Sequence, residues 1–244
     1  MRRICAPTLD ARLETALALC RPCALIADIG ADHGRQSAAA LMRGVAQHAL
    51  IAVVSAKALE KARARVFRLG LEDRAVFAVA DGLDALSALA GQSADTIFIL
   101  GMGGDTLSGI LLRGQARLAG ATLVLSAHTD VPALRQTVCD VGSRIHQEAV
   151  AQDGERYYIL MQCQPAAPHE PTYDDEALWL GPELLKTLPP LWKPVLERRM
   201  RLLKQGIGAM ERAGLRKDEA RLDAFRREMV CVRRALDRYE EVAL

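Results

Sequence analysis

The apolar positions of the first two thirds of the chain fall in short continuous runs separated by amphipathic stretches. Five such runs cover residues 25–28, 49–54, 76–80, 96–100 and 122–126. Runs that are apolar on both faces are typical of parallel strands covered by helices on both sides. The alternation therefore predicts an α/β fold with an open, doubly wound sheet.

Two more strand-like runs follow closely, at residues 144–150 and 157–163. The short stretch between them, 151–156, predicts a hairpin, so the sheet is expected to end in antiparallel strands. A proline-bearing loop then marks a domain boundary, with prolines at 165, 168 and 171. We expect one domain over 1–164, a linker and docking segment over 165–192, and a third region from 193 onward.

The last region, 193–244, carries two apolar stripes with heptad spacing. The first stripe is Leu196, Met200, Leu203, Ile207 and Met210, and the second is Leu222, Phe225, Met229, Val232 and Leu236. Gly214 lies between them and can end the first helix. The pattern predicts an antiparallel helical hairpin within a monomer; pairing between two chains in a homodimer is the alternative.

The stretch "ADIGADHGRQS", residues 27–37, follows the first run as a glycine-bearing turn. A dinucleotide fingerprint reads G-x-G-x-x-G, but here Asp32 takes the second glycine position and His33 follows it. A carboxylate repels a diphosphate. The turn therefore favours a ligand without phosphates and with a positive centre, and S-adenosylmethionine has that character.

Polar clusters follow three of the predicted strands, and the carboxyl ends of parallel strands are where open α/β sheets bind ligands. The clusters are Asp28, Gly30, Asp32 and His33; Asp81 and Gly82; and Gly101, Met102, Gly103, Gly104 and Asp105. We expect Asp28 and Gly30 at the methionine end of the cofactor, Asp32 at its ammonium and Asp81 at its adenine amino group. The alternatives are that the aspartates cap helices and the glycines serve only turns.

Composition narrows the class of protein. Half of the 244 residues are apolar, the net charge is +2, and six cysteines show no disulfide framework or zinc-ligand spacing. No uninterrupted apolar window of about 18 residues and no signal-peptide pattern occurs. We expect a cytoplasmic protein with no membrane segment and no metal.

Charge is distributed unevenly. Residues 193–244 contain 14 Lys or Arg and 9 Asp or Glu, whereas the rest of the chain is slightly acidic. The candidate RNA-binding residues flank the first apolar stripe: Arg198, Arg199, Arg201 and Lys204. We expect charge reversal at the three arginines to leave the fold intact. The alternative is that the basic excess is an ordinary solvated helical face.

Several stretches together resemble one family, the bacterial tRNA (adenine22-N1)-methyltransferases. They are "LDARLETALALC", "ADIGADH", "ADGLDAL", "ILGMGGDTL", "DGERYYIL" and "LGPELLK". The resemblance implies a class I methyltransferase with a seven-stranded, Rossmann-like sheet and a C-terminal coiled coil. It also implies that S-adenosylmethionine is used to methylate N1 of an adenine in the D-arm region of tRNA.

Adenine N1 has a lone pair in the ring, so this reaction needs alignment more than base catalysis. The base must leave its pairing partner or its stack to reach the methyl group. The candidate catalytic residues are His33, Met102 and Asp105. Asp105 or Asp32 would stabilise positive charge developing on the base, and His33 would contact the base or brace its own loop.

Two stretches depart from the family pattern. Val53 and Val54 stand where the family has an acidic residue for the ribose hydroxyls, and Ser126-Ala127-His128-Thr129 replaces a Gln-Pro-Asn-like stretch. Two other readings therefore stay open. One is a family member that binds RNA without catalysis. The other is an NADP-dependent reductase with Ser55 and Lys57 at a ribose phosphate, against which Asp32 argues.

Overall fold

The computed structural model describes residues 5–31, 33–167, 170, 172–212 and 219–242. The chain divides into two compact units, Met1–Pro171 and Thr172–Leu244. Four residues named above lie outside the described ones: Asp32, Pro168, Pro171 and Gly214.

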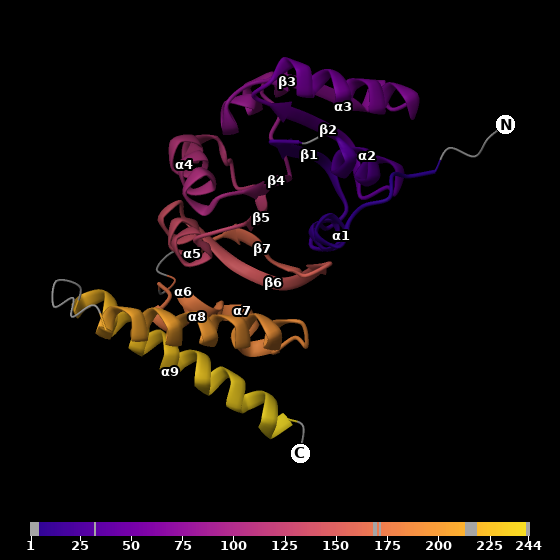
Figure 1. The fold of residues 1–244 in the computed structure, drawn as a ribbon. Helices are drawn as coiled ribbons and strands as arrows, with labels where there is room; N and C mark the ends of the chain where they lie inside the picture. The colour runs from indigo at the N-terminus through magenta and orange to yellow at the C-terminus, as the bar shows by residue number, and fades with distance from the viewer. Residues whose placement is uncertain (1–4, 32, 168–169, 171, 213–218, 243–244) are drawn as a thin grey trace. The chain divides into compact units, whose positions relative to one another are not determined.

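Within the described residues, the first unit is built on a sheet of seven strands in the order β3-β2-β1-β4-β5-β7-β6 (Figure 1). The strands are β1 (Cys23–Ile29), β2 (Ala46–Val53), β3 (Ala75–Val79), β4 (Thr96–Met102), β5 (Thr122–Ala127), β6 (Ser143–Asp153) and β7 (Arg156–Pro165). The first five are parallel, and β7 is antiparallel to both β5 and β6. The predicted doubly wound sheet with an antiparallel end is confirmed.

The connection between β6 and β7 is shorter than the six residues predicted. Pairing continues to Asp153 opposite Arg156, which leaves only Gly154 and Glu155 between the strands. Gly154 has a positive φ of 58°, as tight two-residue hairpin turns require. The prediction was wrong because the Asp-Gly pair that marks the turn lies inside a polar stretch that resembles a loop.

Helices cover both faces of this sheet. They are α1 (Ala11–Ala18), α2 (Arg35–Met42), α3 (Ala56–Arg68), α4 (Gly104–Gly114) and α5 (Val131–Asp140), with 3-10 helices η1 (Glu72–Arg74), η2 (Gly82–Leu89) and η3 (Gln115–Arg117). Apolar residues of α1, α2 and α3 form one core with alternate strand residues such as Ile26, Ile51 and Phe98. Helices α4 and α5 lie on the other side of the sheet (Figure 1).

The second unit is helical. It contains α6 (Asp175–Leu180), α7 (Pro182–Thr187), α8 (Trp192–Arg212) and α9 (Glu219–Val242). Two short helices thus lie in the segment expected as a linker. Asp174 caps α6 by accepting from the Ala177 amide at 2.8 Å, and Pro182 begins α7 at a position where its missing N–H costs nothing.

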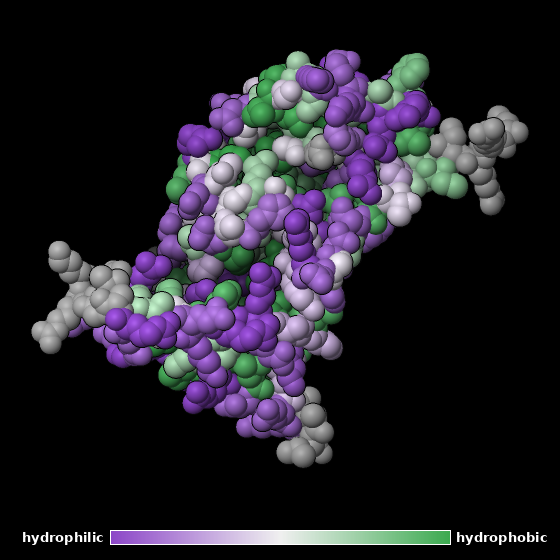
Figure 2. Space-filling view, in the orientation of Figure 1, coloured by the Kyte–Doolittle hydropathy of each residue, from purple (hydrophilic) through white to green (hydrophobic). Residues whose placement is uncertain are grey.

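The long helices α8 and α9 pack as the predicted antiparallel hairpin. Trp192 at the start of α8 lies against Tyr239 near the end of α9, and Glu211 at the end of α8 pairs with Arg226 early in α9. Leu196, Leu203 and Val232 of the two apolar stripes are buried. Away from this seam, the visible face of the hairpin is largely hydrophilic (Figure 2).

Arg199 is not a free flanking residue of that hairpin. Its Nε and Nη2 donate to the two carboxylate oxygens of Glu228, both at 2.6 Å, and Glu228 is only 5% exposed. The premise that Arg199 flanks the stripe without a partner is therefore wrong. Charge reversal would place a second carboxylate beside the buried Glu228, so we expect it to destabilise the fold.

Neither the long helices nor any other described helix has a stretch apolar enough to cross a bilayer.

Candidate active site

A cavity of about 100 Å³ lies at the carboxyl ends of β1 and β4, which are neighbours in the sheet. The chain leaves β1 toward β2 and β4 toward β5, so this is the switch point of the sheet. The lining residues are Asp10, Arg12, Leu13, Asp28, Gly30, Ala31, Arg35, Gln36 and Leu100. This volume is below the several hundred Å³ typical of whole-ligand sites, so it suits one polar end of a larger ligand.

Two residues of the cavity carry buried polar atoms that no hydrogen bond satisfies. They are Nη1 of Arg12 on α1 and both amide atoms of Gln36 on α2. Leaving a buried donor unpaired typically costs about 1–3 kcal/mol, and more for a charged group. A ligand with an anionic group, such as a carboxylate, would satisfy the guanidinium here.

Arg12 was missed by the sequence analysis. Its guanidinium also lies over the Tyr158 ring, with Cζ 5.6 Å from the ring centroid, which holds it between α1 and the sheet. Arg12 lies within the "LDARL" stretch, two residues after Asp10, whose side chain caps α1. Nothing in helical spacing separates such an arginine from a solvated one, so the family-like stretch was the only signal.

Asp28, on β1, brings a carboxylate to the same cavity. It is 5% exposed, and its Oδ2 accepts a hydrogen bond from Ser37 Oγ at 2.7 Å. Burial raises the pKa of Asp28 to about 6, and the Ser37 hydrogen bond opposes that rise. Near neutral pH, the cavity therefore holds a mostly ionised carboxylate that would attract a cationic group.

Gly30 and Gly101 shape this edge of the sheet. Both have positive φ, 76° and 78°. A side chain at Gly30 would collide with Met102, and one at Gly101 would collide with the Arg12 guanidinium. Gly101 coincides with a register shift between β4 and β5, so the irregular strand end makes room for Arg12 and aims Met102 toward Gly30.

The rest of the predicted glycine turn begins α4. Gly103 caps the helix, Gly104 is its first residue, and the Gly104 amide donates to Thr129 Oγ1 at 3.4 Å. A Cβ at Gly104 would lie 2.5 Å from the Thr129 carbonyl oxygen, whereas one at Gly103 meets only ordinary contact. Asp105 is exposed in the first turn of α4.

Asp81 and Gly82 lie at the end of β3 but do not line the cavity. The Asp81 side chain makes no cap hydrogen bond to η2, so the alternative that it caps that helix is wrong. Its Oδ2 instead accepts from Arg113 Nη2 at 3.3 Å, and both side chains are more than 60% exposed. Gly82 is buried at the start of η2.

His33 lies in the loop between β1 and α2, with a positive φ of 56°. Its carbonyl oxygen accepts a hydrogen bond from Arg65 Nε of α3 at 2.8 Å. This contact braces the loop through the His33 backbone. The neighbouring Asp32, the candidate for the ligand ammonium, lies outside the described residues.

The two departures from the family pattern are visible in the structure. Val53 ends β2 in a buried position, Val54 is 71% exposed, and the next residue, Ser55, caps α3. This strand end therefore presents no carboxylate. After β5, Ser126 Oγ donates to the Ile159 carbonyl at 3.1 Å, and His128 packs edge-on against Tyr158.

The candidate RNA-binding residues lie on α8, in the second unit. Arg198, Arg201 and Lys204 are exposed. Arg199 is the residue that pairs with Glu228, so its charge is engaged within the hairpin.

The chain is similar to known methyltransferases. A family model described as "Methyltransferase domain" matches residues 9–161. The tRNA (adenine(22)-N(1))-methyltransferase of Bacillus subtilis is 27% identical over 175 residues, 71% of each chain.

Two solved structures share the fold over nearly the whole chain. The M1A22 tRNA methyltransferase TrmK of B. subtilis has a TM-score of 0.83 at 20% identity, covering 94% of this chain and 99% of that one. The M. capricolum TrmK complex with S-adenosyl-homocysteine has a TM-score of 0.80 at 19% identity, covering 95% and 99%. Since the family model covers more than half of the chain, this protein belongs to the methyltransferase domain family.

Proposed function

We propose that the chain is an S-adenosylmethionine-dependent tRNA methyltransferase that modifies N1 of adenine 22. One observation carries the proposal. A single cavity at the switch point holds both Arg12, whose buried Nη1 has no hydrogen bond, and the buried carboxylate of Asp28. The amino-acid end of S-adenosylmethionine carries a carboxylate and an ammonium, which complement these two charges. The B. subtilis relative bears the same activity in its name, and the M. capricolum structure holds the demethylated cofactor product.

In this proposal, the residues around β1 and β4 hold the cofactor. Arg12 binds its carboxylate, Asp28 and Asp32 attract its ammonium, and Gly30 and Gly101 allow the backbone to approach it. Asp81, Gly82, Gly103 and Gly104 complete the site toward the adenine. Once bound, S-adenosylmethionine supplies an electrophilic methyl group on a sulfonium.

The chain itself supplies position and charge. Met102, held against Gly30, would limit where the target base can lie, and Asp105 at the start of α4 would stabilise the positive charge that develops on adenine. His33 would place its ring beside the acceptor while Arg65 holds its backbone. Alignment of this kind supplies most of the acceleration that an in-line transfer needs.

Arg198, Arg201 and Lys204 would contact the phosphate backbone of tRNA from the hairpin. Arg199 contributes by holding α8 against α9. Because both apolar stripes face each other within one chain, we further propose that the protein acts as a monomer, in the cytoplasm where its substrate is found.

The test is incubation of the protein with S-adenosylmethionine and unmodified bacterial tRNA, followed by nucleoside mass spectrometry and mapping of the modified position. We expect 1-methyladenosine at position 22. Calorimetric titration with the cofactor alone is run in parallel. Cofactor binding without methylation would redirect the proposal to an RNA-binding relative, and absence of cofactor binding would refute it.

A further inference from the structure

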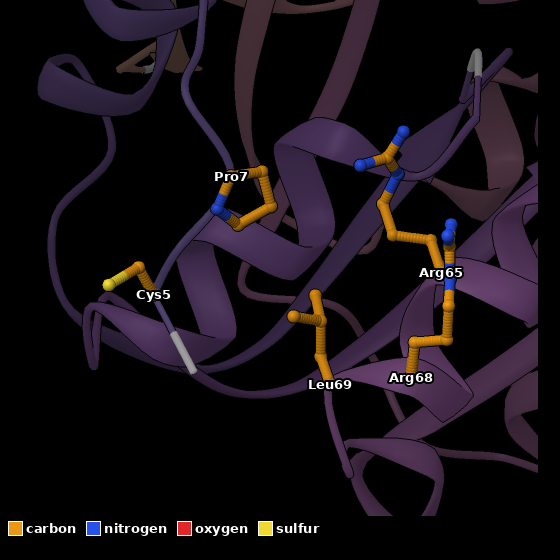
Figure 3. A pocket seen from close by; sticks show the side chains of 5 residues that line it. All are labelled: Cys5, Pro7, Arg65, Arg68 and Leu69. Carbon is orange, nitrogen blue, oxygen red and sulfur yellow. The ribbon is translucent and has the colours of Figure 1, made fainter. Parts of the chain in front are cut away.

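A second cavity, of about 280 Å³, lies between the N-terminal segment and α3. It is lined by Cys5, Pro7, Arg65, Arg68 and Leu69. Figure 3 shows the Arg65 and Arg68 side chains extending in the same direction from α3, with Cys5 and Pro7 on a separate segment across the cavity. The cavity is thus lined by two basic side chains together with apolar and sulfur-bearing ones.

A third arginine belongs to the same cluster. It is Arg35, at the start of α2. Burial lowers the pKa of Arg65, and the nearby positive charges of Arg35 and Arg68 lower it further. Each guanidinium uses one donor on a backbone carbonyl: Arg35 on Thr8 at 2.6 Å, Arg65 on His33 at 2.8 Å and Arg68 on Ala64 at 3.1 Å. These contacts fix the groups in place and leave most of their donors available.

No carboxylate pairs with any of these three arginines in the part of the chain that the structure describes. Three like charges held together repel one another, so the cluster gains stability from any anion that enters. A guanidinium has planar, forked donors that match the oxygens of a phosphate. The chemistry of the cluster therefore suits an oxyanion, and a polyanion with phosphate groups would engage several of the arginines at once.

The cluster is continuous with the cofactor cavity. Arg35 lines the first cavity and not the second, and Arg65 donates to the His33 carbonyl in the loop that follows Gly30 and Ala31. An anion bound at the arginines would therefore lie close to the proposed methyl donor.

Helix α3 extends the positive surface. It contains five basic residues and one acidic residue, and Lys57, Lys61, Arg65 and Arg68 are spaced 4, 4 and 3 residues apart, on one helical face. Phe67 beside them is 72% exposed. A basic stripe along a helix is typical of protein surfaces that bind nucleic acids, and an exposed aromatic ring can stack on a base.

We propose that Arg35, Arg65 and Arg68 form a phosphate-binding site that holds the RNA backbone near the target base, with Lys57 and Lys61 continuing the contact along α3. The inference rests on the proposed function, since the polyanion is the RNA substrate. It adds a second anchor for that substrate, within the methyltransferase unit itself.

The test compares Arg68→Glu with the parent in filter binding of unmodified tRNA over a series of salt concentrations. Arg68 is chosen because it is exposed and its hydrogen bond is to Ala64 of its own helix. We expect tRNA binding to weaken roughly tenfold and the slope of log K against log salt to flatten by about 0.7–0.9, the loss of one phosphate contact. Cofactor affinity stays at the parent value, and Arg68→Lys restores most of the binding.

Arg21→Glu is the matched control. Arg21 is an exposed cation that precedes β1, at the opposite edge of the sheet from the cofactor cavity, and its reversal should leave both affinity and slope unchanged. Lys61→Glu is a second, independent test of the α3 surface. We expect it to weaken tRNA binding by a smaller factor than Arg68→Glu does.

Two results would overturn the inference while leaving the proposed function intact. One is parent-level tRNA affinity and slope in both Arg68→Glu and Lys61→Glu, in a protein that methylates tRNA. The other is inorganic phosphate raising the melting temperature of the parent but not of Arg68→Glu, with tRNA binding unchanged, which would assign the site to free phosphate. A parent protein that neither binds nor methylates tRNA would instead refute the proposed function.

Discussion

The arginines of the helical hairpin and those around the cofactor cavity differ in one respect, their partners. In the second unit, Arg199, Arg226, Arg227 and Arg234 each lie within 4 Å of a carboxylate oxygen. In the first unit, Arg12, Arg35, Arg65 and Arg68 have no such partner among the described residues. The hairpin has the larger basic excess in the sequence, yet the charges of these four hairpin arginines are already engaged by carboxylates. Net charge of a segment is therefore a weaker guide to ligand binding than the pairing of each cation.

Arginines paired with carboxylates should contribute to the stability of the fold. The largest effect is expected for a buried pair in the first unit. Arg135 of α5 and Glu148 of β6 are fully buried, with Nη2 2.9 Å from the carboxylate. Glu148→Ala leaves a buried charge without its partner, so we expect the free energy of unfolding to fall by about 3–5 kcal/mol. Urea denaturation measures it. The exposed pair offers the control, since Arg113→Ala should change stability by less than about 1 kcal/mol.

The hairpin pair should show a smaller effect of the same kind. Arg199→Glu places a second carboxylate against buried Glu228, and we expect a loss of about 3 kcal/mol, reduced because the Arg199 side chain is 41% exposed. Thermal unfolding checks this, with the double variant Arg199→Glu, Glu228→Arg expected to recover part of the loss. Parent-level stability in Arg199→Glu would show that the pair contributes little.

An unpaired arginine should behave in the opposite way. Arg12→Met removes the unsatisfied guanidinium and keeps much of its apolar stem, so the free energy of unfolding should be unchanged or higher. Cofactor affinity should fall by about 2 kcal/mol, roughly thirtyfold, because a charge-assisted hydrogen bond is lost. Calorimetric titration and urea denaturation are run on the same sample. A loss of stability with unchanged cofactor affinity would make Arg12 a structural residue.

The Asp28 carboxylate predicts a pH dependence. With its pKa at about 6, Asp28 is mostly ionised at pH 7.5 and mostly protonated at pH 5, so attraction for the cofactor ammonium should weaken as the pH falls. We expect affinity to drop up to about tenfold per pH unit below 6. The other charged side chains that line the described part of the cavity are Asp10, Arg12 and Arg35. Asp28→Asn should lack this dependence in titrations at pH 5, 6 and 7.5.

The raised pKa of Asp28 also affects the stability of the fold. Lower pH should weaken cofactor binding but stabilise the folded state. A carboxyl group whose pKa is raised on folding binds its proton more tightly in the folded state, so it stabilises the fold as the pH falls from about 7 toward 4. Asp28→Asn should accordingly be at least as stable as the parent at pH 7.5.

The smallest effect is expected for exposed cations of the hairpin. Charge reversal at both Arg198 and Arg201 should weaken tRNA binding a few-fold and flatten the salt dependence, with melting temperature unchanged because neither side chain has a partner among the described residues. Arg233→Glu, on an exposed position of α9, is the control for a general charge effect. Equal weakening in the control would point to long-range attraction instead of contact.

The sheet was predictable because its signal is local. Continuous apolar runs such as 122–126 form the buried central strands, the run 76–80 forms the more exposed edge strand β3, and all seven strands were found within a few residues of their observed ends. The cavity proposed to hold the cofactor lies at these strand ends, where Asp28 and Gly30 line it. The sequence did not predict which other residues line that cavity, since Arg12 reaches it from a helix near the start of the chain.

Partnerships between distant residues explain the remaining differences. Arg199 meets Glu228 across 29 positions, and heptad spacing predicts which residues face the seam without saying which charged residue lies beside which. The Asp81 side chain similarly turns to Arg113, 32 positions away, instead of to its own helix. Such pairs depend on how elements pack, and a single sequence carries no direct signal for them.

The unsatisfied guanidinium of Arg12 has a consequence for the lifetime of the protein. Since α1 brings Arg12 to the cavity, a ligand that satisfies it also ties this early helix to the sheet, and binding stabilises the folded state by a free energy that grows with the logarithm of ligand concentration. Transient detachment of α1 would expose the apolar surface that its buried face covers, a state open to proteases. The abundance of the protein in a cell should then follow the supply of its methyl donor, so that a starved cell keeps less of an enzyme it cannot use.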